Sequence, residues 1–421
     1  MCDRRCAICD VRYAMCDFFA TINRYTIANR KSHYANLTTQ MTIRKKMIPF
    51  DVYPVYDVNP VRAEGSYIWD DKGTKYLDFY GGHAVISIGH SHPHYVKMVG
   101  EQLAKIGFYS NSVKMPMQQV LAEKLGQLSG YTDYQLFLCN SGAEANENAL
   151  KLASFVTGRK KVIAFGGAFH GRTSLAVAAT DNPKIVAPIN QTDNIVFVPF
   201  NDTDAFLKVM DEEVAAVIIE GIQGVGGIQI PSTSFMELIQ AKCKEHGSLL
   251  ILDEVQSGYG RTGKFFAHQH YNVKPDIITT AKGMGNGFPV AGVLISPDIK
   301  PVAGMLGTTF GGAYLACAAA TAVLEVMDKE QLMANAAKMG DYLVAKLKAM
   351  GGIKEIRALG LMIGVDLDQP AGAVRHSLVF DHKVFTGAAG THTVRLLPAL
   401  NITPKEADEF LDAFELAIQG R

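Results

Sequence analysis

The segment Ser248-Leu-Leu-Ile-Leu-Asp253 decides the fold expected of this sequence. A short apolar run that ends in a carboxylate is typical of a parallel strand buried on both faces, with its carboxyl end at a ligand site. The segment Pro275-Asp-Ile-Ile-Thr-Thr280 has the same character, and Ala281-Lys282-Gly-Met-Gly-Asn-Gly287 follows it directly. Both segments therefore predict buried strands whose ends carry chemistry.

The same pattern of a short apolar run and a polar or glycine-rich turn recurs from residue 112 onward, with helical stretches between the runs. This alternation indicates βαβ units around a largely parallel sheet, so the fold class is α/β. The predicted buried strands are Gln135–Cys139, Lys161–Phe165, Asn194–Pro199, Val214–Glu220, Leu249–Asp253 and Ile277–Thr280.

The two ends of the chain predict a second, smaller α+β domain. Residues 55–79 alternate apolar and polar around an Asp-Lys-Gly turn, which predicts a β-meander. From residue 313 a long alanine-rich helix, a further helix and three short strands follow; the predicted elements are helix 313–327 and strands 353–357, 362–366 and 394–397. The expected division is an extension at 1–40, an N-terminal segment of the small domain at 41–98, a large cofactor-binding domain at 99–312 and the C-terminal part of the small domain at 313–421.

The first 40 residues do not resemble the rest. Four of the seven cysteines crowd this stretch, and the odd total argues against a complete disulfide framework. Cys6 and Cys9 form a Cys-x-x-Cys, but no second pair follows to complete a zinc site, so we expect no metal. We interpret residues 1–40 as a disordered extension or as sequence upstream of the true start, with Met41 or Met47 beginning the folded protein.

Composition excludes several classes of function. The 421 residues include 41 Lys and Arg against 41 Asp and Glu, and this zero net charge disfavours bulk binding to nucleic acid or an anionic membrane. No apolar run reaches the roughly 18 to 20 residues that span a bilayer, and no secretory signal is visible. We therefore expect a soluble cytoplasmic protein whose partners are small molecules.

The first predicted strand leads into a candidate phosphate site. Ser141, Gly142 and Ala143 follow it and precede a helix, where backbone N–H groups and the helix dipole favour an anion. The alternative is a helix with an ordinary N-cap. The glycine-rich stretch 81–94 carries four histidines, but Pro93 and the lack of a nearby carboxylate favour a loop leading into a helix over a metal site.

Asp253 and Lys282 complete the chemistry at the strand ends. A carboxylate at the end of a buried strand needs a cation or a donor. For Asp253 this is a helix N-terminus that it caps, an ion pair with Arg261, or a ligand. A lysine that leaves an apolar strand is desolvated, which makes its amine nucleophilic. A phosphate site, a strand-end aspartate and a buried lysine together describe a pocket for pyridoxal phosphate, with Lys282 on its aldehyde and Asp253 on its ring nitrogen.

From about Phe50 to the end, the chain resembles the class III pyridoxal-phosphate aminotransferases, and among them it is most similar to the acetylornithine, succinylornithine and ornithine aminotransferases. The matching segments are Asn140–Glu147, Phe169–Thr173, Glu220–Gly224, Leu252–Gln256, Gly260–Gly263, Ala281–Gly283, Gly307–Gly312 and Arg395–Pro398. The resemblance implies the fold type I architecture, with a large domain that holds a mostly parallel sheet between helices and a smaller α+β domain.

The resemblance also implies a role for each matching position. Pyridoxal 5'-phosphate would be bound by Ser141, Gly142, Ala143, Phe169, Asp253, Gln256, Lys282 and, from the other subunit, Thr309. Lys282 and Asp253 would be catalytic. The substrate would be bound by Arg172, Arg395, Asn111 and Glu220. Because Thr309 reaches the phosphate of the other subunit, the expected assembly is a homodimer with the site at the interface.

The implied reaction moves the distal amino group of N-acetylornithine or N-succinylornithine to 2-oxoglutarate, which gives N-acylglutamate semialdehyde and glutamate in arginine biosynthesis. The alternatives are an ornithine δ-aminotransferase, a 4-aminobutyrate aminotransferase, an acyl-lysine transaminase, an aminomutase or racemase, and a non-catalytic dimer. No metal is expected to take part.

The chain departs from the family pattern at three places. Gly221 stands where the family has proline, Val225 where it has glutamate, and Ala313-Tyr314 where Asn-Pro is common. The missing glutamate is the usual partner of Arg395, so its loss leaves the pocket more positive. We therefore hypothesise that the pocket prefers a more anionic donor, N-succinylornithine over N-acetylornithine.

Overall fold

The computed structural model describes residues 47–420, so the expectation for residues 1–40 lies outside the described part of the chain. The chain divides into two units, residues 1–57 and 58–421. The described part of the first unit, residues 47–57, contains no helix or strand. Everything below concerns the second unit.

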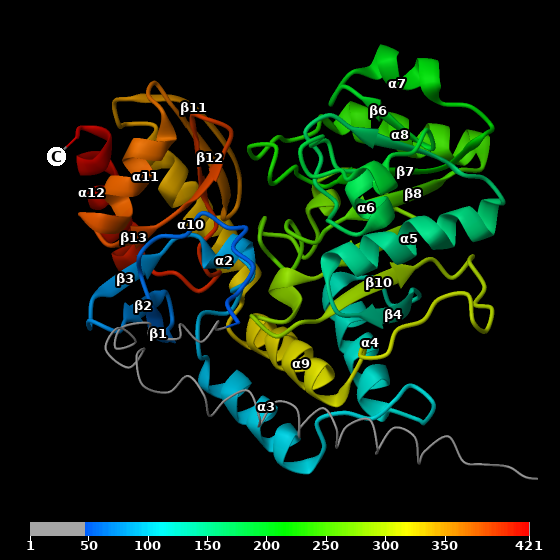
Figure 1. The fold of residues 1–421 in the computed structure, drawn as a ribbon, viewed down its shortest axis with the longest axis horizontal. Coiled ribbons are helices and arrows are strands. Elements are labelled where there is room, and N and C mark those ends of the chain that lie inside the picture. Colours follow the sequence, from blue (N-terminus) through cyan, green and yellow to red (C-terminus); the bar gives the residue numbers. More distant parts are fainter. Residues whose placement is uncertain (1–46, 421) are drawn as a thin grey trace, which may run out of the picture. The chain divides into compact units, whose positions relative to one another are not determined.

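A seven-stranded sheet lies in the part of the second unit that also contains α5 (Gly142–Thr157) and α8 (Thr233–His246) (Figure 1). Its strands are β4 (Gln135–Cys139), β5 (Lys161–Phe165), β6 (Ile195–Val198), β7 (Val214–Glu220), β8 (Leu249–Asp253), β9 (Ile277–Thr280) and β10 (Ala291–Ile295), in the order β4-β10-β9-β8-β7-β5-β6. The six strands predicted from the sequence are confirmed, and the α/β class is correct. The seventh, β10, was not predicted; it runs antiparallel to both β4 and β9.

Alternating side chains of the central strands enter two separate cores. On β7, Ala216 and Ile218 belong to the core under α5, whereas Val217 and Ile219 belong to the core under α8. Because successive residues of a strand point to opposite faces, the sheet is covered on both sides. A strand buried on both faces must be apolar throughout, which explains the uninterrupted apolar runs of the sequence.

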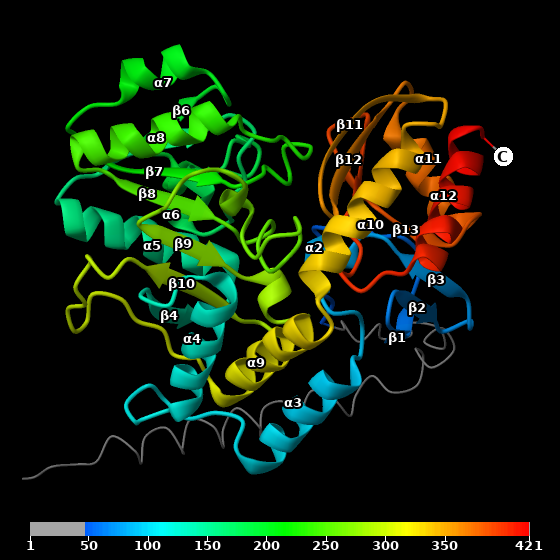
Figure 2. The ribbon, with the colours of Figure 1, turned by 180° about the vertical axis from the view of Figure 1, so that it is seen from behind.

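Segments toward the two ends of the second unit form two four-stranded sheets (Figure 2). One contains β1 (Pro60–Glu64), β2 (Tyr67–Asp70), β3 (Lys75–Asp78) and β13 (Val384–Phe385); the other contains β11 (Ile353–Leu359), β12 (Met362–Leu367), β14 (Gly387–Ala389) and β15 (Thr393–Leu396). The predicted meander is confirmed as β1 to β3. Strand β3 pairs in parallel with β13, so residues from both ends of the unit share one sheet. The domain boundaries given above remain our proposal.

The remaining helices connect and cover these sheets. They are α2 (Gly81–Ala84), α3 (Pro93–Lys105), α4 (Pro116–Ser129), α6 (Ser174–Ala178), α7 (Thr203–Val209), α9 (Tyr314–Lys329), α10 (Leu332–Leu347), α11 (Ala371–Phe380) and α12 (Pro404–Ile418). The 3₁₀ turns are η1 (Pro188–Asn190), η2 (Ala267–His270) and η3 (Lys282–Met284). Among the described residues, no helix is both long and apolar enough to span a membrane.

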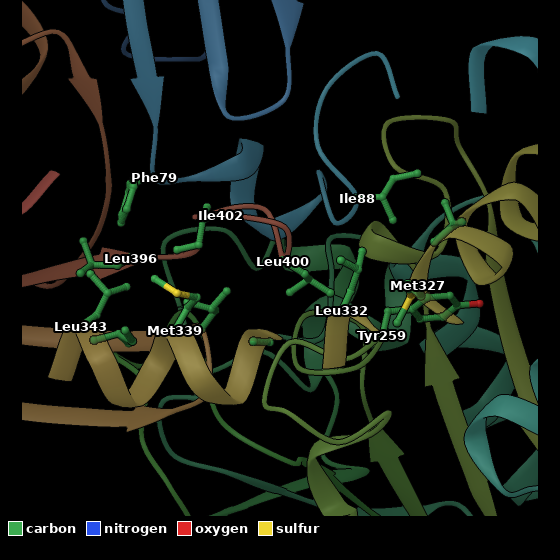
Figure 3. Packing of buried hydrophobic residues seen from close by; sticks show 14 of the residues in the cluster. Phe79, Ile88, Tyr259, Met327, Leu332, Met339, Leu343, Leu396, Leu400 and Ile402 are labelled. Atoms are coloured by element: carbon green, nitrogen blue, oxygen red, sulfur yellow. The ribbon is translucent and has the colours of Figure 1, made fainter. Parts of the chain in front are cut away.

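The largest apolar core joins α9 and α10 to the strands of the smaller sheets (Figure 3). Met339 and Leu343 of α10 lie near Leu396 of β15, and Phe79, which follows β3, stacks on Phe410 of α12 with ring centroids 4.2 Å apart. This core fixes the segments on either side of Phe79 and Leu396, which include Tyr80 and Arg395 of the site.

Candidate active site

A cavity of about 390 Å³ opens at the carboxyl ends of β4, β8 and β9. Seven of the predicted site residues line it: Ser141, Gly142, Ala143, Phe169, Arg172, Asp253 and Lys282. Parallel strands present their carboxyl ends at the same edge of the sheet, which is where ligands of open α/β sheets bind. The sheet therefore brings together residues that lie up to 141 positions apart, from Ser141 to Lys282.

Asp253 is held rigidly at the end of β8. Its carboxylate is 3% exposed; Oδ2 accepts hydrogen bonds of 2.7 Å each from Nδ1 of His170 and Nδ2 of Asn146, and Oδ1 accepts one of 3.0 Å from the N–H of Val255. Asn146 is fixed in turn by Thr279, whose hydroxyl donates to it over 2.6 Å. Three donors offset the cost of burying the charge. The alternative partner, Arg261, instead binds the carbonyls of Leu361 and Pro398.

The helix N-terminus at Gly142 is shaped for an anion. Ser141 is the N-cap of α5, and its hydroxyl accepts a hydrogen bond of 3.2 Å from the N–H of Glu144. A Cβ on Gly142 would lie 2.6 Å from Cγ1 of Val255, so only glycine fits there. The partly buried turn therefore offers backbone N–H groups and the positive end of a helix of 16 residues to the cavity.

Lys282 begins η3 one residue after Ala281, which follows β9, and it has a positive φ of 44°. Burial lowers the pKa of its amine and the charge of Arg395 adds to this, while the carboxylates of Asp253 and Glu220 act in the opposite direction. A left-handed backbone at a residue other than glycine costs about 1–2 kcal/mol, and such strain collects at functional sites. Both features fit an amine that must react in its neutral form.

Glu220 ends β7, next to Asp253 in the sheet. Its carboxylate is 6% exposed and accepts hydrogen bonds from the N–H groups of Phe169 (3.1 Å) and Gly224 (3.0 Å). Burial raises its pKa to about 7. Glu220 thus ties the segment that carries Phe169 to the loop after β7.

Arg395 lies on β15, 3% exposed, and its guanidinium binds neutral acceptors. Nε donates to the carbonyl of Ala388 (2.9 Å), and Nη1 donates to the carbonyl of Gly224 (3.0 Å) and to Oε1 of Gln256 (3.5 Å). Gln256 also donates to the carbonyl of His83 over 3.1 Å, and it is not among the residues that line the cavity. Burial lowers the pKa of Arg395.

Asn111 and Thr309 lie outside the cavity lining. Both are exposed, and Nδ2 of Asn111 donates to the carbonyls of Thr308 (3.3 Å) and Gly311 (3.0 Å). Asn111 therefore fixes the loop that carries Thr309. The histidines after residue 89 do not converge on one point either, because His90, His92 and His94 bind the separate carboxylates of Asp78, Glu330 and Glu325.

Several residues of the site were not predicted from the sequence. Asn146 and His170 hold Asp253, and Nε2 of His170 is buried with no hydrogen-bond partner among the described residues. The sequence carried one signal for Asn146. It is a polar residue directly after Ala145, on the apolar face of its helix, where a buried polar side chain needs a partner. Tyr80 and His83, whose side chains touch, lie close to Arg395 and Lys282.

Comparison with known proteins places this site in a family. A family model described as Aminotransferase class-III matches residues 51–418. The chain is 41% identical over 372 residues to the acetylornithine aminotransferase of Archaeoglobus fulgidus, which covers 88% of this chain and 98% of that protein. It is 37% identical to the acetylornithine/succinyldiaminopimelate aminotransferase of Photorhabdus laumondii, over 92% of this chain and 99% of that protein.

The fold has a close match among solved structures. The ornithine aminotransferase of Toxoplasma gondii superposes with a TM-score of 0.79 at 27% identity, over 99% of this chain and 98% of that one, and its active site holds pyridoxal phosphate at partial occupancy. Fold and site together define a transaminase of the fold type I class. The chain belongs to the class III aminotransferases, which are pyridoxal-phosphate-dependent enzymes.

Proposed function

We propose that this enzyme acts in the cytoplasm and transfers the distal amino group of an N-acylornithine to 2-oxoglutarate, giving N-acylglutamate semialdehyde and glutamate for arginine biosynthesis. One observation carries the proposal: Lys282, Asp253 and the N-terminus of α5 line the same cavity. The relatives named for acetylornithine support the acylornithine donor.

The residues of the cavity fit pyridoxal 5'-phosphate. The glycine at position 142, where a side chain would strike Val255, leaves the start of α5 open to a phosphate. The fixed carboxylate of Asp253 fits a protonated ring nitrogen, and Phe169 lies in the lining to cover the ring. When bound, the cofactor supplies an aldehyde that bonds to amines and a ring that withdraws electrons from the neighbouring carbon.

Lys282 and Asp253 would do the chemical work of the protein. The neutral amine of Lys282 would hold the cofactor at its aldehyde, and, once a substrate amine has taken that place, it would serve as the base that carries a proton from the substrate carbon to the cofactor. Burial supports this role because it lowers the pKa of the amine. Asp253 keeps the ring nitrogen protonated through its negative charge, and Asn146 and His170 hold its carboxylate in place.

Arg172 and Arg395 would bind the substrate carboxylates. Arg172 is exposed in the cavity lining and Arg395 is buried in β15, so two guanidinium groups are available for the two carboxylates of 2-oxoglutarate. Val225, which is 44% exposed, adds no negative charge beside Arg395. This supports tolerance of an anionic acyl group on the donor. Glu220 would complete the substrate side of the pocket.

We also propose a homodimer in which Thr309 reaches the phosphate in the partner's site. Thr309 is exposed and outside its own cavity, and Asn111 holds its loop. Nearby, Phe108 and Phe310 are 41% and 61% exposed, which is unusual for an apolar pair outside an interface. Light scattering of the holoenzyme should give twice the chain mass, and a monomer with full activity would exclude this arrangement.

Titration of the holoenzyme's absorbance tests the function. N-succinylornithine, N-acetylornithine and ornithine are added separately to the yellow enzyme, and 2-oxoglutarate is added afterwards. Bleaching by an acylated donor and recovery with 2-oxoglutarate are expected, with N-succinylornithine the more effective donor. Bleaching by ornithine alone would assign the ornithine δ-aminotransferase reaction instead. No bleaching by any of the three would place the substrate elsewhere in the family.

A further inference from the structure

Residues 81–84 form a left-handed turn beside the candidate active site. The φ angles of Gly81, Gly82, His83 and Ala84 are 55°, 55°, 69° and 64°. Two of these residues are not glycine, and each costs about 1–2 kcal/mol in this conformation. Strain of this kind persists only where the surrounding structure imposes it, so the contacts of the turn indicate what it positions.

Hydrogen bonds fix the turn from both ends. Oδ1 of Asp78 accepts from the N–H groups of Tyr80 (3.0 Å) and Gly81 (2.8 Å), and Oδ2 of Asp78 is held by His90 over 2.9 Å. At the other end, Nε2 of Gln256 donates to the carbonyl of His83 over 3.1 Å. The Tyr80 hydroxyl contacts the imidazole of His83 across the turn. The turn therefore holds Tyr80 and His83 as a pair.

The ring of Tyr80 is directed to Arg395 by the backbone of β14. Gly387 faces Arg395 across the β14–β15 ladder, and a Cβ on Gly387 would lie 2.3 Å from Cε2 of Tyr80 and 3.3 Å from Cβ of Arg395. The Tyr80 ring thus lies directly on Gly387, next to the arginine side chain. The Tyr80 hydroxyl acts as a hydrogen-bond partner of the guanidinium and favours its charged form.

Among the described residues, the hydrogen-bond partners of Arg395 are neutral, and the cation Arg375 acts on its guanidinium through space. These partners are two backbone carbonyls, the amide of Gln256 and the hydroxyl of Tyr80; the Glu220 carboxylate acts on the guanidinium through space. The imidazole of His83 adds no negative charge, and its pKa is lowered by burial and by the charges of Arg395 and Lys282. A buried guanidinium surrounded in this way is oriented but not neutralised, so it keeps its attraction for an anion.

We propose that Tyr80, held by His83 in this left-handed turn, is a specificity-determining residue that orients the Arg395 guanidinium for a carboxylate on the reacting carbon of the substrate. The inference rests on the proposed function at one point, which is that Arg395 binds a carboxylate of the substrate. Glutamate carries a carboxylate on the carbon whose amino group reacts. An N-acylornithine, which reacts at its distal amine, carries none there. Tyr80 therefore acts in the glutamate half-reaction and not in the donor half-reaction.

The experiment compares Tyr80→Phe with wild type in the two half-reactions, each followed by the absorbance of the holoenzyme. A hydrogen bond to a charged group is worth about 1.5–3 kcal/mol, so the apparent dissociation constant for glutamate should rise roughly 10-fold to 100-fold. The apparent dissociation constant for the acylornithine donor should change less than about 3-fold. Tyr95→Phe is the matched control, because its hydroxyl donates to the carbonyl of Gly285 and not to Arg395; it should leave both constants unchanged.

A second variant separates orientation from folding. Val225→Glu places a carboxylate next to Gly224, which binds Arg395, and this internal anion should weaken glutamate binding in the wild-type background while binding of N-acetylornithine, whose acyl group is uncharged, is kept. Competition by glutarate, a dicarboxylate with no amino group, measures the same site at equilibrium. Equal losses in both half-reactions, or unchanged glutamate and glutarate binding in Tyr80→Phe, would overturn the inference. Failure of every acylornithine to react would refute the proposed donor and leave the glutamate measurement valid.

Discussion

The carboxylates of Glu220 and Asp253 end neighbouring parallel strands, and the two residues are direct partners in the β7–β8 ladder. Their environments differ: Asp253 is bound by two side-chain donors and one backbone N–H, whereas Glu220 is bound by backbone N–H groups alone. Pairs of buried carboxylates with unlike partners take different roles, because the surroundings decide which one carries the charge. Here the geometry assigns the fixed charge to Asp253.

Glu220 should make stability depend on pH. Burial raises its pKa from the ordinary 4.5 to about 7, so between these values the folded protein binds a proton that the unfolded chain has released. The stability that this proton contributes is complete below 4.5 and is lost as the pH rises through about 7. We expect Glu220→Gln, which stays neutral, to lose less unfolding free energy than wild type between about pH 5 and about pH 8.

Denaturant unfolding of the cofactor-free protein at the two pH values gives this difference. The amide at position 220 also loses one acceptor for the N–H groups of Phe169 and Gly224, so only the change with pH is diagnostic. Glu213→Gln, at an exposed position, serves as the control and should follow wild type. Parallel curves for wild type and Glu220→Gln would show that Glu220 does not titrate in this range.

Asp253→Asn should separate cofactor chemistry from folding. The N–H₂ of the new amide would face at least one of the three N–H donors that now bind the carboxylate. The amide also has no negative charge to stabilise a protonated ring nitrogen. We expect kcat to fall by about 10²-fold to 10³-fold, the usual effect of removing a group that stabilises the charge of a transition state. The absorbance spectrum of the bound cofactor should change as well.

The matched control is Asp276→Asn. Asp276 is a partly buried carboxylate just before β9, at the amino end of the strand and therefore at the opposite end from the site. It accepts a hydrogen bond of 2.8 Å from the N–H of Leu250, so its loss affects stability alone. Activity near wild type in Asp253→Asn would refute the role given to the aspartate.

Gly142→Ala should damage the phosphate site through a single methyl group. The new Cβ would lie 2.6 Å from Cγ1 of Val255, a distance that forces the start of α5 or Val255 to move. We expect the affinity for pyridoxal phosphate to fall roughly 5-fold to 150-fold, since overpacking typically costs about 1–3 kcal/mol. Equilibrium titration of the cofactor-free protein with pyridoxal phosphate measures it.

Two further variants test the cause. Val255→Ala added to Gly142→Ala removes the clashing methyl groups and should restore most of the affinity. Gly100→Ala, in the middle of α3 with no atom within 4 Å of the added Cβ, should leave cofactor binding unchanged. Loss of affinity that the double variant does not recover would point away from this contact.

The sequence predicted the sheet well because its strands are buried on both faces, and burial demands continuous apolar runs. Strand β10 was missed because it comes soon after Pro289 and contains Gly292, two residues that are unfavourable in strands. The glycine has a packing reason: its Cβ would lie 3.0 Å from a methyl group of Leu136 on the adjacent β4. A contact between strands far apart in sequence leaves no periodic signal.

The candidate site was predictable where residues lie at or just beyond the end of a strand, as Asp253 and Lys282 do. The residues that hold them were not, because Asn146, His170 and Tyr80 act through tertiary hydrogen bonds with no fixed spacing in the chain. The loop at Gln256 shows the same limit. The resemblance to the family predicts that Gln256 contacts the cofactor, and this stays a prediction; its hydrogen bonds to His83 and Arg395 have no signal in the sequence.

Lys282→Ala should abolish both transamination and covalent attachment of pyridoxal phosphate. Burial lowers the pKa of the Lys282 amine, so at neutral pH the neutral fraction exceeds that of a solvated lysine and falls as the pH drops below the lowered pKa. Reduction of the holoenzyme with borohydride followed by intact-mass measurement should show one added cofactor per chain in wild type and none in Lys282→Ala. Lys300→Ala, at an exposed lysine whose amine donates to the carbonyl of Pro297, should retain the added mass and the activity. A persistent adduct in Lys282→Ala would place the reactive amine on a different lysine, and an unchanged mass in wild type would refute covalent attachment of the cofactor.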